Sequence, residues 1–402
     1  MRCRRRVITA LLGLALSAGL SAWAGPEPPA ATEGIQAALK ALADDDPRAA
    51  ERIAARLAVS GAAGAQRAWL IAGTARQRLG SYADAAQAYR RFLACCDDAD
   101  ERRYVLERIE ECTSAAGDAP RPRPASQLLS RRQLARLATV EGRHRRQIET
   151  TEHFAVRAYN DELARLTGRR AEVALAHICR VILRGQEFPH SVDIYVWPTI
   201  SEFRKHATSA PEWAGGSFSI TRGPDGAARR RIDLTQLDDE QRFDTAMLDR
   251  VLPHEICHLV VAEYFGDRPC PLAINEGLAM MAEATVDNAR VRLAGAVLAG
   301  EKKIPLGRLL TLTAVDGEQA HVFYAEAFSL TSYLHHGMTA RQFRELLAQI
   351  KGGCAFEDAV QRALGLPHED GFLGRLASAW EDEAIRQGQF LRALDTEVSA
   401  AR

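Results

Sequence analysis

One short segment constrains the chain more than any other: His254, Glu255 and His258 form a His-Glu-x-x-His sequence inside an apolar run. Residues four apart lie on one face of a helix, so a helix here presents both imidazoles to a single cation. Glu255 then lies beside that cation, where it can accept a proton from a water molecule. The spacing predicts two metal ligands and one general base.

A third ligand is needed, because a catalytic zinc ion takes three protein ligands and leaves one position open. Glu276, in an Asn-Glu-Gly sequence, follows His258 by 18 positions. If a turn separates two helices here, its carboxylate can approach both imidazoles. We therefore predict Zn2+ bound by His254, His258 and Glu276.

The two sequences together, His-Glu-x-x-His and Asn-Glu-Gly-Leu-Ala, resemble those of the gluzincin zinc metallopeptidases, a peptidase MA-like group with thermolysin-like enzymes and zinc aminopeptidases. The resemblance implies an α+β fold: a zincin-like domain over residues 148–390 with a small mixed sheet, active helices at 251–284 and a mainly helical part at 300–390. It also implies peptide-bond hydrolysis by a zinc-activated water with Glu255 as general base.

Family members stabilise the tetrahedral oxyanion with a Tyr or His that follows the glutamate ligand, which makes Tyr324 the candidate by position. A packing role for Tyr324 stays open, and His321, His335 and His336 are alternatives.

Two departures from the family pattern bear on the activity. Thermolysin-like enzymes place an acid four positions after the glutamate ligand to orient a zinc-binding His, and here that position is Met280. Glu283 could take this role, although we favour a solvated side chain for it. The Gly-x-Met-Glu-Asn sequence of the aminopeptidases is absent, so we favour an endopeptidase, or cleavage of an unusual peptide such as a cell-wall crosslink.

An alternative from another class is a non-catalytic exported scaffold, in which zinc only stabilises the fold and a tetratricopeptide-like region binds a protein partner. The coordination of the ion separates the two hypotheses, because a structural zinc site is closed and a catalytic one is open.

The first 24 residues predict a cleavable signal peptide. Arginines are followed by an apolar run over residues 7–20 and by Ala22-Trp23-Ala24, an A-x-A cleavage sequence. A retained anchor is less favoured because about 20 apolar residues are needed to span a bilayer. We expect a periplasmic or secreted protein without stable membrane insertion.

Residues 25–118 predict an all-α domain of about five helices. Part of it resembles one tetratricopeptide repeat, at Trp69, Gly73, Gly80, Tyr82, Ala85 and Tyr89. A docking groove for a protein partner and a packing module without a partner both fit this pattern. Residues 119–147 predict a Pro/Arg-rich linker and a basic helix from about 127 to 146.

The remaining observations restrict partners and local structure. Lysine plus arginine equals aspartate plus glutamate at 52 each, so the net charge does not favour nucleic acid as a partner. Strands are expected at 153–157, 191–196, 215–220 and 229–234, with residues 216–220 as a candidate peptide-binding edge. Seven cysteines follow the signal segment; a bridge between Cys257 and Cys270, or from Cys95 or Cys96 to Cys112, is conceivable but not required.

Overall fold

The computed structural model describes most of the chain after the expected signal peptide, whose residues 1–24 lie outside the described part. Described are residues 29–400 except 45, 60–64, 117–123, 141–146, 208–213, 224–225, 239, 285–287, 316 and 318. Within these ranges, no helix combines the length and the apolar character needed to cross a membrane.

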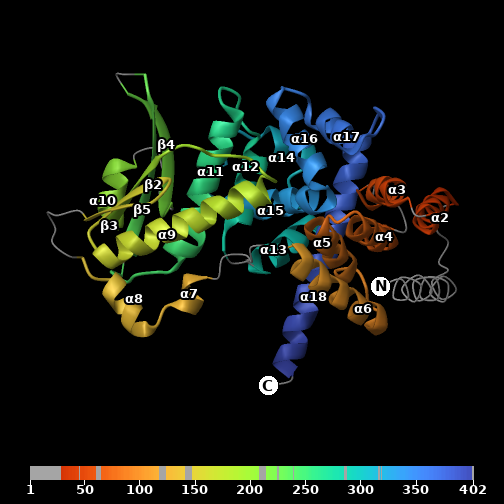
Figure 1. The fold of residues 1–402 in the computed structure, drawn as a ribbon, viewed down its shortest axis with the longest axis horizontal. Helices are drawn as coiled ribbons and strands as arrows, with labels where there is room; N and C mark the ends of the chain where they lie inside the picture. Colours follow the sequence, from red (N-terminus) through yellow and green to blue (C-terminus); the bar gives the residue numbers. More distant parts are fainter. Residues whose placement is uncertain are drawn as a thin grey trace.

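A five-stranded mixed sheet forms one end of the molecule (Figure 1). The strand order is β1-β2-β3-β5-β4; β2, β3 and β5 run parallel, and the outer strands β1 and β4 are antiparallel to their neighbours. The bounds are β1 (Gln147–Thr150), β2 (Phe154–Ala158), β3 (Val192–Thr199), β4 (Gly216–Arg222) and β5 (Ala228–Leu237). The four expected strands and the mixed sheet are confirmed, whereas β1 is a strand that the sequence did not predict.

Helices cover both faces of this sheet. On one face, α9 (Asp161–His177) packs on β1 and β2 while α11 (Leu252–Phe265) packs on β4 and β5. On the other face, α10 (Ile200–His206) lies over β3 and β5, where Phe203 and Trp197 form a small apolar cluster of their own. Trp197 faces the opposite side from its neighbour Val196 in the main core, as the two-residue period of a strand requires.

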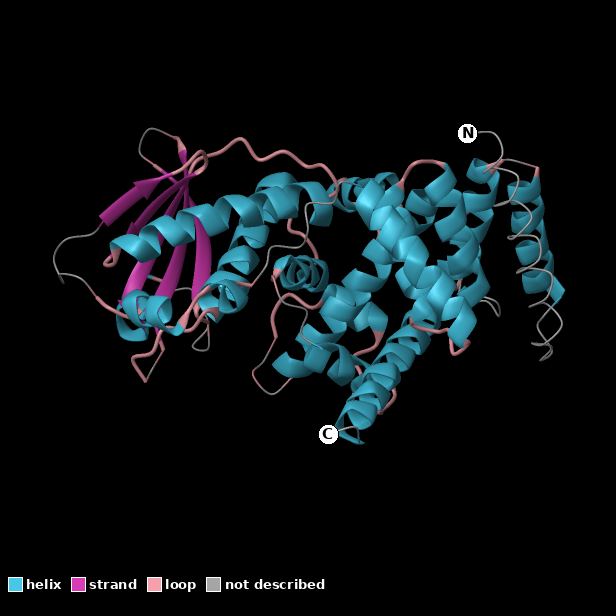
Figure 2. Cartoon of the chain, turned by 60° about the horizontal axis from the view of Figure 1, so that its bottom comes forward, coloured by secondary structure: helices cyan, strands magenta, loops and turns pink. Residues whose placement is uncertain are grey.

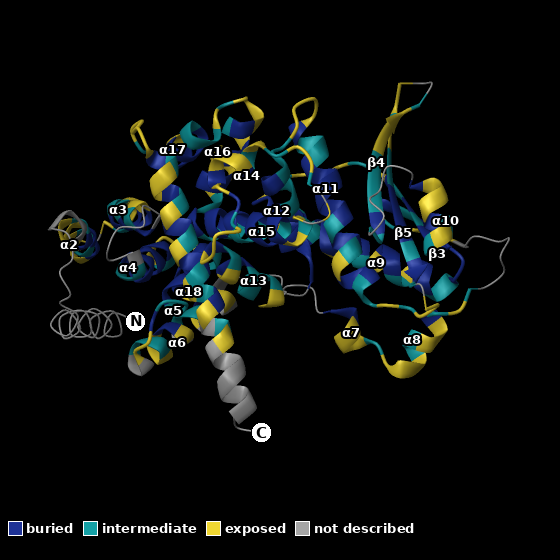
Figure 3. Cartoon of the chain, turned by 180° about the vertical axis from the view of Figure 1, so that it is seen from behind, coloured by how far each residue is buried: buried dark blue, intermediate teal, exposed yellow. Residues whose placement is uncertain are grey.

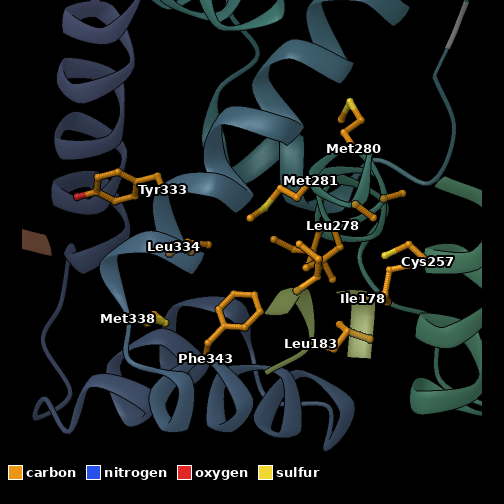
Figure 4. Close-up of a cluster of buried hydrophobic side chains, with 14 of the residues drawn as sticks. Ile178, Leu183, Cys257, Leu278, Met280, Met281, Tyr333, Leu334, Met338 and Phe343 are labelled. Carbon is orange, nitrogen blue, oxygen red and sulfur yellow. The ribbon is translucent and has the colours of Figure 1, made fainter. Parts of the chain in front are cut away.

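Beyond the sheet the chain is helical, as Figure 2 shows. The C-terminal helices are α12 (Leu272–Ala282), α13 (Asn288–Leu298), α14 (Leu306–Thr311), α15 (Ala320–Gly337), α16 (Ala340–Lys351), α17 (Phe356–Leu364) and α18 (Phe372–Ala400). This confirms the expected mainly helical C-terminal part, although α13 was not predicted. In Figure 4, apolar side chains of α11, α12, α15 and α16 meet in one buried cluster that includes Cys257, Leu278 and Phe343.

One glycine sets the distance between α12 and α15. A Cβ atom at Gly277 would lie 2.1 Å from Oγ1 of Thr331 and 2.5 Å from the carbonyl oxygen of Ala327. Only a residue without a side chain permits this approach. Because Gly277 directly follows Glu276, the close packing also fixes the position of that carboxylate.

The N-terminal part contains five helices within the described residues, each packed against the next, and this number is the expected one. They are α2 (Pro29–Ala43), α3 (Pro47–Val59), α4 (Ala65–Arg78), α5 (Tyr82–Leu93) and α6 (Ala99–Ala116). The resemblance to a tetratricopeptide repeat and the domain boundaries stay predictions.

These N-terminal helices dock onto the C-terminal helices through buried ion pairs. Arg91 of α5 lies 3.0 Å from Glu383 of α18, and Asp84 of α5 lies 2.6 Å from Arg184, which follows α9. Figure 3 shows buried residues on both sides of this junction, and the apolar core is continuous across it.

The expected basic helix over residues 127–146 is wrong. Two short helices occur instead, α7 (Ala125–Leu128) and α8 (Arg131–Leu137). Ser130 between them is extended and forms a capping box with Gln133, so it begins a new helix rather than continuing the first. The start of α7 is held by Asp249, whose carboxylate accepts hydrogen bonds from the backbone N–H of Ala125 and Ser126 at 2.6 and 3.2 Å.

Glu326 on α15 should make the stability of the fold depend on pH. Its side chain is fully buried and accepts hydrogen bonds from the N–H of Ile304 at 3.1 and 3.3 Å; burial raises its pKa from 4.5 to about 7. Because the folded pKa exceeds the unfolded one, ionisation of this group costs stability as pH rises from about 4.5 to 7, by up to about 3 kcal/mol.

Replacing the carboxyl by an amide removes this cost. The free energy of unfolding of Glu326→Gln minus that of the wild type should therefore be larger at pH 8 than at pH 5, which means that the variant gains stability relative to the wild type as pH rises. Urea unfolding of both proteins at the two pH values checks this, and an equal difference at both would contradict it.

Candidate metal centre

The helix that carries the first two predicted ligands begins immediately before them. A π-helical turn, η2 (Met247–Val251), passes directly into α11 at Leu252. Pro253, in the first turn of α11, has no N–H to continue the helical hydrogen bonds, and the carbonyl of Asp249 accepts instead from the N–H of Ala284 at 2.7 Å. Val251 at the junction is itself helical, so the helix changes from π to α before His254 without a break.

The three predicted ligands converge. Nε2 of His254 and Nε2 of His258 are 3.0 Å apart, and Oε2 of Glu276 lies 3.5 Å from the first and 3.6 Å from the second. Three ligands of a tetrahedral zinc ion at about 2.0–2.1 Å are about 3.3 Å from one another. The donor set and its spacing therefore fit a metal ion of this kind, and these three residues form a candidate metal site.

Two carboxylates outside this triangle add negative charge to the site. Glu283 places Oε1 3.5 Å from Nδ1 of His254, and Glu255 is a buried neighbour of both imidazoles. Burial opposes a charge on His254, but hydrogen bonds to Glu276 and Glu283 outweigh it and raise its pKa to about 10. Burial also opposes a charge on Glu276 and by itself would raise the pKa of this carboxyl, but hydrogen bonds to the two imidazoles outweigh burial and lower the pKa to about 2. These shifts show that the buried site favours a positive charge beside its carboxylates, in this case a proton on His254.

Two residues orient the imidazoles. Oδ1 of Asn275 lies 3.0 Å from Nδ1 of His258, and Glu283 approaches Nδ1 of His254. Such partners fix the ring orientation and leave Nε2 for the metal. The solvated Glu283 that the sequence favoured is wrong: it is 4% exposed and is also paired with Arg250 at 3.2 Å and Arg290 at 3.4 Å.

Glu255 lies between α11 and the edge strand β4. It is 9% exposed, burial raises its pKa, and its carboxylate accepts a hydrogen bond from the backbone N–H of Phe218 on β4. A Cβ atom at Gly216 would lie 2.4 Å from Cγ1 of Val251 and 3.0 Å from Cγ of Glu255, so this glycine permits the close approach of strand and helix. The ring of Phe218 also stacks on that of His258, with centroids 5.7 Å apart. A contact of Asn275 with a ligand was not predicted, and Phe218 was predicted only as part of the candidate peptide-binding edge over residues 216–220.

The candidate oxyanion donors lie on α15. Tyr324 is half-buried and packs edge-on against Phe323, and its predicted role stays a prediction. Among the alternatives, His335 binds Arg184 at 3.0 Å, His336 lies 3.1 Å from Oγ of Ser332, and His321 is exposed.

The seven cysteines in the described part of the chain are free thiols. Cys257 is buried in the apolar cluster behind α11, and no bridge joins it to Cys270. The conceivable bridges from Cys95 or Cys96 to Cys112 are not formed either.

If Glu283 orients His254, its loss should weaken metal binding without removing a ligand. Glu283→Gln keeps the size of the side chain and removes its charge, so metal affinity should fall about tenfold to a hundredfold. Glu263→Gln, on the same helix as the imidazoles but paired with Arg230 at 2.6 Å, is the matched control. Competition with a chelator measures both affinities, and an unchanged affinity in Glu283→Gln would show that this carboxylate has no orienting role.

A comparison with known proteins identifies the family of the chain. A family model of the Peptidase MA superfamily matches residues 171–381, which is more than half of the chain and includes all three candidate ligands. Searches of curated proteins and of solved structures found no match. Members of this superfamily are usually metal-dependent, in keeping with the His-His-Glu cluster. The chain belongs to the Peptidase MA superfamily.

Proposed function

We propose that this protein is an exported zinc-dependent endopeptidase of the gluzincin type, with the ion held by His254, His258 and Glu276. The observation that carries the proposal is the triangle of ligand atoms, 3.0, 3.5 and 3.6 Å on its sides, beside a buried carboxylate that is not part of it. A purely structural zinc site has four protein ligands and needs no such carboxylate. Glu255 therefore favours catalysis over the scaffold alternative.

A zinc ion held by His254, His258 and Glu276 would supply Lewis-acid chemistry for water and for a peptide carbonyl. Glu255 is the group that accepts the proton of the attacking water and returns it to the leaving amine. The hydrogen bond from the N–H of Phe218 holds the carboxylate in place. Asn275 and Glu283 hold the two imidazoles with Nε2 directed to the ion.

The edge strand β4 is suited to bind an extended peptide. The carbonyl of Gly215 accepts a hydrogen bond from the backbone N–H of Thr235 in β5 at 3.1 Å. Because the partner direction alternates along a strand, the odd-numbered residues of this segment direct their backbone groups to β5. The even-numbered residues then direct their backbone groups to the open edge, as the bond from Phe218 to Glu255 indicates. A substrate strand can pair there with little dependence on its side chains, which suits an endopeptidase.

Tyr324 is our candidate for the second oxyanion donor. Hydroxyl Oγ1 of Thr331 donates to the carbonyl of Ala273 at 3.4 Å, and Gly277 touches Ala327, so α12 and α15 run antiparallel. Because of this packing, the N-terminal part of α15 with Tyr324 lies beside the C-terminal half of α12, the part of that helix that follows Glu276.

Two further elements of the proposal rest on sequence patterns. The A-x-A segment before residue 25 supports export to the periplasm or the medium. The chain of packed helices from α2 to α6 supports a tetratricopeptide-like region that binds a protein partner. The substrate is a peptide or a protein.

The variants Glu255→Gln and His258→Ala test the mechanism together. Glu255→Gln removes the base but no ligand, so zinc occupancy should survive. The rate of hydrolysis of an unfolded protein substrate, labelled with fluorophores that are quenched until it is cleaved, should fall at least about a hundredfold. His258→Ala should lose zinc and activity together. Metal analysis beside the rate measurement separates the two effects, and Glu263→Gln serves as control. Wild-type activity in Glu255→Gln would refute the mechanism.

Removing the Tyr324 hydroxyl should cost less than removing the base. Tyr324→Phe takes away one oxyanion donor and leaves the ion in place, so kcat should fall about tenfold to a hundredfold with little change in KM. An unchanged kcat would leave Tyr324 with a packing role only.

A further inference from the structure

A cavity that is separate from the candidate metal site lies where the N-terminal helices meet the rest of the molecule. Its volume is about 630 Å³, the size of a small organic ligand. Its walls come from α5, η1 (Ile178–Ile182), α12, α13, α15 and α18, which meet near the centre of the molecule in Figure 1.

The cavity wall is cationic. Its lining contains four guanidinium groups and no carboxylate: Arg90, Arg91, Arg180 and Arg184. Arg91 and Arg184 are buried and held by Glu383 and Asp84. Arg180 is exposed and has no ion pair with a described residue, and Arg90 of α5, also exposed, lines the same cavity. Arginine side chains that line a cavity bind carboxylate or phosphate groups through paired hydrogen bonds.

The backbone around the cavity is irregular in two places. Residues 178–182 form a π-helical turn at the end of α9, and Arg184 adopts a left-handed conformation with φ of 55°. Both features are uncommon and cluster at functional sites. Arg184 is held in this conformation by Asp84, by Gln87 at 2.8 Å and by the carbonyl of His335 at 2.9 Å.

The rest of the lining is largely apolar and includes Ile182, Met281 and Phe328. We propose that this cavity binds a small organic anion, whose carboxylate or phosphate is held by Arg90 and Arg180 and whose apolar part packs on Ile182, Met281 and Phe328. The ligand would bridge the N-terminal helices and α12, the helix that carries Glu276. The inference does not depend on peptidase activity.

Binding of octyl phosphate and octanoate to the metal-loaded protein, measured by calorimetry at low salt, tests the proposal. Both anions should bind, more tightly than inorganic phosphate, whereas octanol, which lacks the charge, should not. Arg180→Gln and Arg90→Gln should each weaken binding at least about tenfold. Arg169→Gln, an exposed arginine on α9 outside the cavity, is the matched control and should leave the affinity unchanged.

The two arginines are exposed, so their replacement should not disturb the fold, and circular dichroism checks this. Neither substitution touches the metal ligands, so anions that bind only to the ion would be insensitive to both. That insensitivity would overturn the proposal, as would the failure of both anions to bind the wild type. A requirement for phosphate over carboxylate, or the reverse, would identify the ligand class within it.

Discussion

The charge balance of the candidate metal site is the constraint on which the surrounding structure depends. Three carboxylates, Glu255, Glu276 and Glu283, surround the imidazoles of His254 and His258, and all five side chains are mostly shielded from water. Buried carboxylates are costly unless a cation accompanies them. Arg250 and Arg290 accompany Glu283, a proton on His254 balances part of the remaining charge, and a divalent ion between the ligands would balance more of it. The same arrangement that requires the cation leaves Glu255 beside it as a base.

Close contacts between backbones hold these charges at fixed positions. Gly277 lets α15 touch α12 directly after Glu276, and Gly216 lets β4 touch α11 beside Glu255. At the other end of α12, buried ion pairs join the N-terminal helices to α18 and enclose the cationic cavity. Buried ion pairs add little net stability, but they define which surfaces meet. The helix α12 thus has an acidic candidate metal site on one side and a basic cavity on another.

The sequence predicted the parts of the site that depend on local spacing. His254 and His258 share a helix face, and Glu276 follows on the next helix, so four positions and one turn suffice to identify them. Glu283 could not be placed in the same way, because α12 ends at Ala282 and the backbone of Glu283 is extended, with ψ of 138°. Its carboxylate contacts His254 from a residue beyond the end of the helix, and the spacing of residues along a helix cannot predict such a contact. The four arginines of the cavity come from segments far apart in the chain, and their meeting depends on packing that the sequence does not state.

The coordination of the bound ion tests the central claim most directly. X-ray absorption spectroscopy of the zinc-loaded protein should show two imidazole nitrogens at about 2.0–2.1 Å and oxygen ligands from Glu276 and water at about 2.0–2.2 Å, with no sulfur. Glu255→Gln should leave this spectrum unchanged, because Glu255 lies outside the ligand triangle. A sulfur ligand at about 2.3 Å, or a shell closed by Glu255 as a fourth protein ligand, would contradict the account.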